Sequence, residues 1–213
     1  MRGPATVLLC TWALALPAQH APFDERQLHR EFNEAQGDTG KYARAEVLAT
    51  YYGFYGKAEC VQWVDTSLRY ARLLHDSARV MQTLGYARGY YTRTGLYADA
   101  IAVTEQMIAR SDVAKDAGKL VGLHCHAGYC LSALGERAQA LKRYEEAIAL
   151  VGRYKLDPDF MAQPLYSIGR LYFETGDPKN AETYLLQCLP LTQKKDDRVG
   201  QAQTWMYLGM ARS

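Results

Sequence analysis

The residues of this sequence that could do chemistry lie in one short segment, His124-Cys125-His126, followed by Cys130. Imidazole and thiolate side chains bind zinc and other soft metals. His126 and Cys130 are four residues apart, so on a helix both point to one side. Two ligands do not complete a site, and His124 and Cys125 would project to other faces. We expect no metal and no other cofactor. The chain carries no phosphate-binding loop or nucleophile motif, so we also expect no catalytic residues.

The segment sits inside an internal repeat. Glycines recur at Gly56, Gly95, Gly135 and Gly176, at intervals of 39, 40 and 41 residues. A near-constant period of this length is typical of one supersecondary unit stacked several times, each copy burying its apolar face against its neighbours. The sequence therefore predicts a row of similar units in place of a single central core.

The copies share a large residue four positions before the glycine and, in three of them, an alanine five positions after it. The large residues are Tyr52, Tyr91, Leu131 and Tyr172, and the alanines are Ala100, Ala140 and Ala181. This combination suits two antiparallel helices that cross closely, because alanine lets the backbones approach while the large side chain fills the gap. Glycine permits the turn between the two helices.

These columns resemble the tetratricopeptide repeat family over roughly residues 41–213. The match is best in residues 123–150, where Gly128, Gly135, Ala140, Tyr144 and Ala147 occupy motif positions. The resemblance implies an all-α, right-handed superhelix of about four antiparallel helix pairs, followed by one unpaired helix. Because the period exceeds the usual 34 or so residues, we expect longer polar links at 110–119, 152–159 and 193–197.

The sequence divides into three parts. Residues 1–18 have the features of a secretory signal, with an apolar run at Val7 to Leu16 that is shorter than the about 20 residues of a membrane span. We therefore expect a secreted or periplasmic protein without a membrane span; the alternative is an ordinary first helix in a cytoplasmic protein. Residues 22–40 are predicted to form a capping helix and linker, and residues 41–213 the repeat domain. The cysteines of the repeats are expected to be buried free thiols.

In this family the first helices of the repeats line a concave groove. Carrying the groove positions over gives Gln82, Gly85, Gly89, Thr92, Cys125, Tyr129, Ser132, Gln163, Tyr166, Arg170, Phe173, Gln203, Met206 and Met210. This surface is aromatic and rich in amides, and Arg170 is its single positive group, so the carboxylate clamp of some family members is not reproduced. A helix or extended peptide with apolar anchors is the expected ligand. The alternative is that several of the tyrosines only fill space between helices.

The charge balance excludes some partners. With 25 basic and 23 acidic residues and a net charge of +2, no electrostatic footprint for nucleic acid or anionic lipid emerges. We expect a non-catalytic protein- or peptide-binding scaffold or sensor module, similar to the exported tetratricopeptide input regions of bacterial sensor kinases and regulators. One alternative is an assembly factor that self-associates through an apolar terminal helix, Trp205 to Met210. Another is a cytosolic adaptor.

Overall fold

The computed structural model describes residues 24–194 and 197–212, and within these ranges the chain is helical without a strand. The expected signal at residues 1–18 lies outside the described residues. The helices are α1 (Glu25–Glu34), α2 (Gly37–Phe54), α3 (Glu59–Leu73), α4 (Ser77–Arg93), α5 (Tyr97–Arg110), α6 (Ala117–Ala133), α7 (Arg137–Arg153), the 3-10 helix η1 (Pro158–Met161), α8 (Ala162–Glu174), α9 (Pro178–Lys194) and α10 (Arg198–Ala211).

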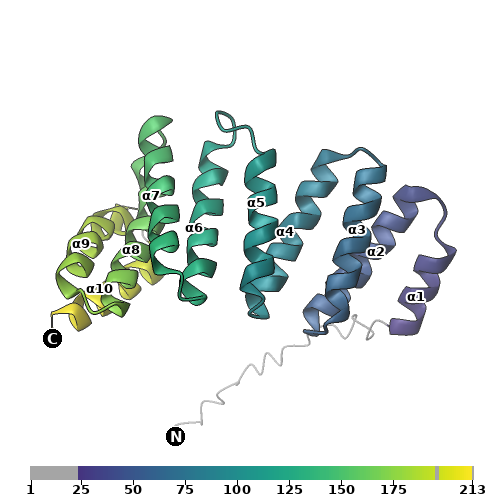
Figure 1. Ribbon diagram of the computed structural model, residues 1–213, viewed down its shortest axis with the longest axis horizontal. Helices are drawn as coiled ribbons and strands as arrows, with labels where there is room; N and C mark the ends of the chain where they lie inside the picture. The colour runs from purple at the N-terminus through teal and green to yellow at the C-terminus, as the bar shows by residue number, and fades with distance from the viewer. Residues whose placement is uncertain (1–23, 195–196, 213) are drawn as a thin grey trace, which may run out of the picture.

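The helices form antiparallel pairs, α2 with α3, α4 with α5, α6 with α7 and α8 with α9. The pairs stand side by side in a curved row, with α1 at one end and α9 and α10 at the other (Figure 1). Helices α2 and α4, α6 and α8, and α8 and α10 also contact each other directly. We call α2, α4, α6, α8 and α10 the inner helices and α3, α5, α7 and α9 the outer helices. The predicted all-α superhelix of antiparallel helix pairs is confirmed.

Each inner helix of a pair ends at one of the four repeating glycines. Gly56, Gly95, Gly135 and Gly176 have φ values of 64°, 77°, 82° and 78°, in the left-handed region that favours glycine. The residue after each glycine donates its N–H to the carbonyl of the large residue four positions before the glycine, at 2.8–2.9 Å. This Schellman pattern explains why the large residue and the glycine keep a fixed spacing.

Close helix crossing depends on a second set of glycines. A Cβ atom on Gly128 of α6 would lie 2.6 Å from the Tyr144 ring of α7, and one on Gly169 of α8 would lie 2.7 Å from Leu185 of α9. Both distances are far below van der Waals contact, so only glycine allows these helices to approach as they do. The opposing alanines, Ala140 and Ala181, are fully buried.

The apolar interior forms two clusters. One extends through α1 to α5, from Leu28 to Val103, and includes Cys130; the other extends through α6 to α8, from Leu120 to Leu171. Ile101 and Met107 of α5 pack against both. The described cysteines Cys60, Cys125, Cys130 and Cys188 are buried free thiols, as expected. None of the helices in the described residues is long and apolar enough to cross a bilayer.

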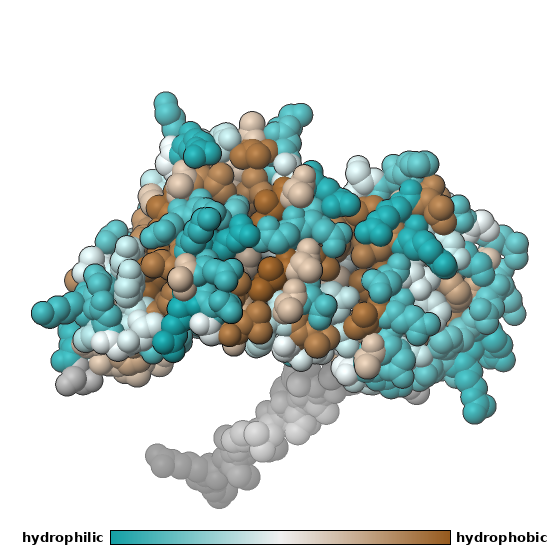
Figure 2. Space-filling view, in the orientation of Figure 1, coloured by the Kyte–Doolittle hydropathy of each residue, from teal (hydrophilic) through white to brown (hydrophobic). Residues whose placement is uncertain are grey.

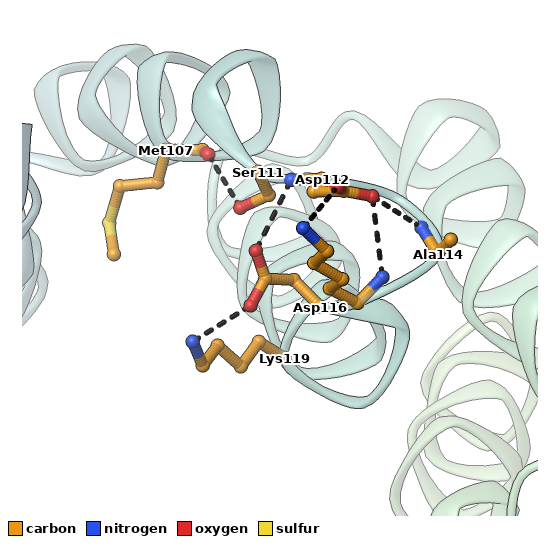
Figure 3. Close-up of polar contacts among 7 residues, drawn as sticks. Met107, Ser111, Asp112, Ala114, Asp116 and Lys119 are labelled. Atoms are coloured by element: carbon orange, nitrogen blue, oxygen red, sulfur yellow. Dashed lines mark hydrogen bonds and ion pairs between the residues drawn. The ribbon is translucent and has the colours of Figure 1, made fainter.

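The long period is carried largely by long helices, because α4, α6, α7 and α9 have 17 residues each, and in one place by a longer link. The α5–α6 link, drawn in Figure 3, is held by the Asp112 carboxylate, which accepts the N–H groups of Ala114 and Lys115 at 3.0 and 3.3 Å. Asp116 accepts the N–H of Asp112 and pairs with Lys119 at 2.8 Å, which lowers the pKa of Asp116. Side-chain bonds thus replace a glycine turn here.

Candidate functional site

A cleft of about 520 Å³ opens between α6, η1, α8, α9 and α10. We call it the C-terminal cleft. Gly118 and Gly122 of α6 line one side, and the Phe160 ring of η1 lies against Gly118, where a Cβ would be 3.2 Å from the ring. The predicted groove residues Gln163, Tyr166 and Gln203 also line it. The structure therefore brings these three predicted residues together around one hollow that offers an aromatic face and two amides.

Aromatic rings continue from this cleft along the inner helices. Tyr207 of α10 makes edge contacts with Tyr166 and Phe173 of α8, with ring centroids 5.9 and 5.5 Å apart. Tyr129 of α6 makes an edge contact with Tyr97 at 6.2 Å. Tyr166 and Phe173 of α8 thus form one cluster with Tyr207, while Tyr129 of α6 pairs with a ring of the second repeat.

Arg170, the one cation predicted in the groove, is already compensated. Its guanidinium lies 5.8 Å from the centroid of the Tyr129 ring, and its Nε is 3.3 Å from a carboxylate oxygen of Glu174. The carboxylate and the aromatic face already neutralise much of the positive field of the guanidinium, so it attracts a ligand carboxylate only weakly. Arg170 therefore adds little net positive charge to this surface.

The predicted groove residues of α4 lie apart from the cleft. Gln82 is exposed and near the Tyr86 hydroxyl at 3.5 Å, and Gly85 and Gly89 have open space where a Cβ would be. Thr92 is turned toward a neighbouring repeat, as described below. Of the remaining predicted residues, Ser132 is half-buried, and Met206 and Met210 are exposed.

Cys125 is not a groove residue, and its assignment to the groove was wrong. Its side chain is 2% exposed and belongs to the cluster formed by α6, α7 and α8. Burial raises the pKa of the thiol to about 12, so it stays protonated. The family column places this position on the groove side, but in this chain the side chain packs among the apolar residues of α6, α7 and α8.

The histidines beside Cys125 serve two different junctions. His124 Nδ1 lies 3.0 Å from a Glu146 carboxylate oxygen of α7, and burial lowers the pKa of His124. Arg143 bridges that carboxylate, at 3.2 Å, to Glu105 of α5. His124 therefore belongs to a charged cluster that joins α5, α6 and α7.

His126 joins the second and third repeats. Its Nε2 is 2.8 Å from the Thr92 hydroxyl of α4, and its Nδ1 is 3.1 Å from the Thr104 hydroxyl of α5. Burial, together with the charge of Arg88, lowers the pKa of His126 to about 4. A neutral imidazole carries one N–H and donates it to one of the two threonine hydroxyls, and both hydroxyls also donate to carbonyls of their own helices, those of Arg88 and Ala100. Cys130 lies 4.0 Å away. Among the described residues no group of three or more His, Cys, Asp and Glu side chains is placed to hold a metal.

Sequence reasoning missed three aromatic residues of the groove: Tyr97, Phe160 and Tyr207. Tyr97 begins an outer helix, and Phe160 lies in an inter-repeat link, where the family offers no groove column. Tyr207 aligns with Ser167 of the preceding repeat, so no repeated large residue marked it. The one signal in the sequence that could have found Phe160 is an aromatic residue within the otherwise polar link.

The comparisons with known proteins agree with this architecture. The family model for the tetratricopeptide repeat matches residues 120–194. The fold is similar to the crystal structure of BtubC (BKLC) from P. vanneervenii, with a TM-score of 0.66 and 18% identity over 87% of this chain and 80% of that chain. It is also similar to kinesin-light-chain-type, nearly identical TPR-like repeats from Podosopora anserina, with a TM-score of 0.62 and 17% identity over 82% of this chain and 85% of that chain. No curated protein sequence matches the chain.

The paired helices, the glycine turns and the matched repeats identify a helical repeat protein of the solenoid class. Residues 120–194 match the tetratricopeptide repeat family, and the fold of the described chain is that of tetratricopeptide-like repeat proteins.

Proposed function

We propose that this protein binds an extended peptide segment of a partner protein along its inner groove, without catalysis. The C-terminal cleft carries the proposal, because it is a hollow of about 520 Å³ on the inner side of the row. Volumes of this size are typical of ligand sites, which combine apolar walls with a few polar groups. Phe160 and Tyr166 supply the walls, and Gln163 and Gln203 supply the amides.

The peptide that suits this groove carries a bulky apolar side chain and little charge. The side chain would enter the C-terminal cleft, while the glutamine amides hydrogen-bond to the peptide backbone. The ion pair of Arg170 with Glu174 disfavours capture of an acidic C-terminus, because a ligand carboxylate would first have to displace Glu174. Kinesin-light-chain-type repeats share the fold, which supports a scaffold role for this chain.

Selection from a displayed peptide library, followed by calorimetry with a selected peptide, tests the proposal. We expect enriched peptides to share an aromatic or large aliphatic residue, and Tyr166→Ala to weaken binding by about tenfold or more, as loss of an aromatic anchor does. Tyr55→Ala is the matched control, because Tyr55 is 52% exposed and lies at the far end of the row. Equal binding by both variants, with unchanged circular dichroism, would refute the assignment of the groove.

We also propose that the protein is exported and that its binding role serves a sensor or scaffold outside the cytoplasm. The apolar run at 7–16 and the proline and small residue after it support this. N-terminal sequencing of the protein recovered from an expressing bacterium tests export. A mature chain beginning near residue 19 is expected, and an intact N-terminus in the cytoplasmic fraction would favour the adaptor alternative.

A further inference from the structure

The last inner helix repeats the small-residue position that the two preceding inner helices use for close packing. Gly128, Gly169 and Gly209 follow one another at intervals of 41 and 40 residues. At Gly128 and Gly169 the outer helix of the pair fills the space where a Cβ would stand, with Tyr144 and Leu185 respectively. At Gly209 no atom of the described structure lies within 4 Å of that position. The surface around Gly209 thus has the form of a helix-packing face but is open.

A second residue of the same face shows the same change. Leu165 stands four positions before Gly169 and is 6% exposed, whereas Trp205 stands four positions before Gly209 and is 52% exposed. Val199 and Met206 of the same side of α10 are 69% and 51% exposed. Exposed apolar side chains gathered on one helix face in this way mark an interaction surface.

The charges around this face favour contact with a similar face. Residues 199–211 carry no charged side chain. Arg212, which follows, is paired with Glu182 of α9 at 2.6 Å. Two such faces can meet without bringing like charges together.

The other end of the row is unsuited to cover α10. The outward side of α1 carries the exposed residues Arg26, Gln27, Arg30, Asn33 and Glu34, and the surface at that end is mostly hydrophilic (Figure 2). Stacking α10 of one molecule on α1 of the next would remove these charges from water without partners on α10. End-to-end growth is therefore disfavoured.

The face of α10 is complementary to itself. Trp205 is a large side chain and Gly209 is a gap, and the two lie four residues apart on one side of the helix. When two α10 helices cross antiparallel about a twofold axis level with residue 207, Trp205 of each copy stands opposite Gly209 of the other. This repeats, between molecules, the large-on-small packing that joins α6 to α7 and α8 to α9. We propose that α10 is the interface of a twofold homodimer, with Trp205 of one copy packed on Gly209 of the second copy.

An interface built mainly from one helix face lies at the small end of specific interfaces, which bury about 1,200–2,000 Å² in total. We therefore expect a weak dimer with a dissociation constant on the order of micromolar. Sedimentation velocity over a dilution series measures it. Trp205→Ala should weaken the dimer at least tenfold, and Gly209→Glu should abolish it without loss of helix content.

Phe54→Ala is the control, because Phe54 is 80% exposed and lies outside α10; it should dimerise like the parent chain. A parent chain that is monomeric at every concentration up to the millimolar range would overturn the proposal. So would a dimer that the Trp205 and Gly209 variants leave unchanged.

Cysteine cross-linking tests the antiparallel register. A mixture of Trp205→Cys and Gly209→Cys chains should form a disulfide-linked heterodimer under mild oxidation, while each variant alone should stay largely uncross-linked. The parent chain measures the background from its own buried thiols. Cross-linking of Trp205→Cys with itself in preference to the mixture would indicate a parallel arrangement and contradict the proposed axis. Cross-linking no greater than the background in every sample would contradict contact through α10.

Discussion

The glycines within the helices of this chain differ in what an added methyl group would do. At Gly128 a Cβ meets the buried Tyr144 ring at 2.6 Å, whereas at Gly122 of the same helix nothing lies within 4 Å. We expect Gly128→Ala to lower the free energy of unfolding by about 1–3 kcal/mol through overpacking. Gly122→Ala should raise it by up to about 1 kcal/mol through helix propensity. Urea denaturation of both variants checks this; destabilisation of equal size would contradict the crossing geometry.

In the part of the chain that the structure describes, two residues other than glycine adopt a left-handed backbone. His75 and Lys155 have φ values of 52° and 50° at the ends of α3 and α7. Such a conformation costs about 1–2 kcal/mol for a residue with a Cβ. We expect Lys155→Gly to stabilise the protein by about 1 kcal/mol and Gly135→Ala to destabilise it by about 1–2 kcal/mol. Thermal and chemical unfolding of the two variants measure whether each is more or less stable than the parent chain. A Gly135→Ala chain more stable than the parent would contradict this prediction.

Acid should weaken the protein through His126. Its pKa in the folded chain is lowered to about 4, so the unfolded chain binds a proton more readily, with a pKa near 6.5. The contribution of a neutral His126 is fully present above about pH 6.5 and is lost as the pH falls toward 4. Because part of the ring meets solvent, we expect a loss on the order of 1 kcal/mol.

The measurement is the urea midpoint between pH 7.5 and pH 4.5, compared between the parent chain and His126→Gln. The variant should show a flatter dependence, although His124, whose pKa burial also lowers, leaves a smaller slope of the same sign. Parallel profiles for the two chains would show that His126 does not control the response.

At this scale the sequence was informative where a residue repeats and misleading where it does not. The repeated glycine, tyrosine and alanine positions predicted the turns and helix crossings correctly. Each of them reflects a steric requirement that recurs from repeat to repeat. Cys125 and Thr92 were assigned by column alone. Cys125 lies in the core and Thr92 contacts His126. Both positions depend on contacts with a neighbouring repeat, and these contacts do not recur in the other repeats.

Helix ends are the part of each element that the sequence predicts best. Asp177 accepts the N–H of Asn180 at 3.1 Å and precedes Pro178, and Asp157 accepts the N–H of Asp159 at 2.9 Å before Pro158. In both caps an aspartate is followed by proline, which is a local signal in the sequence. The α5–α6 link was foreseen as polar, but its fold was not, since it depends on which of several carboxylates accepts which N–H.

The stability of an element should follow its number of neighbours. Helix α6 is packed by α5, α7 and α8, whereas α10 contacts only α8 and α9 within the described chain. In a one-dimensional stack, the end unit opens most easily. We expect the backbone amides of α10 to exchange with deuterium faster than those of α6 in dilute solution, as hydrogen exchange with mass spectrometry can show. Equal protection of the two helices at low concentration would be inconsistent with an open end.

At the scale of the whole molecule, the sequence predicted the arrangement of the helices better than the shape of the surface. The period and the repeated residue positions predicted the helix pairs and the order of inner and outer helices. The C-terminal cleft was not foreseen. It arises where the η1 link brings Phe160 against Gly118, and a link outside the repeat pattern has no column from which its position could be inferred.

The two long edges of the row differ in how much change of length they tolerate. The turns from inner to outer helices share one glycine geometry, while the links between repeats differ in length and include the α5–α6 link on the upper edge in Figure 1. A few inserted residues would break a glycine turn, whereas in the α5–α6 link they would break only hydrogen bonds made within the link itself. An epitope tag or fluorophore-bearing segment placed within residues 112–115 would therefore report on the intact protein while leaving the groove free.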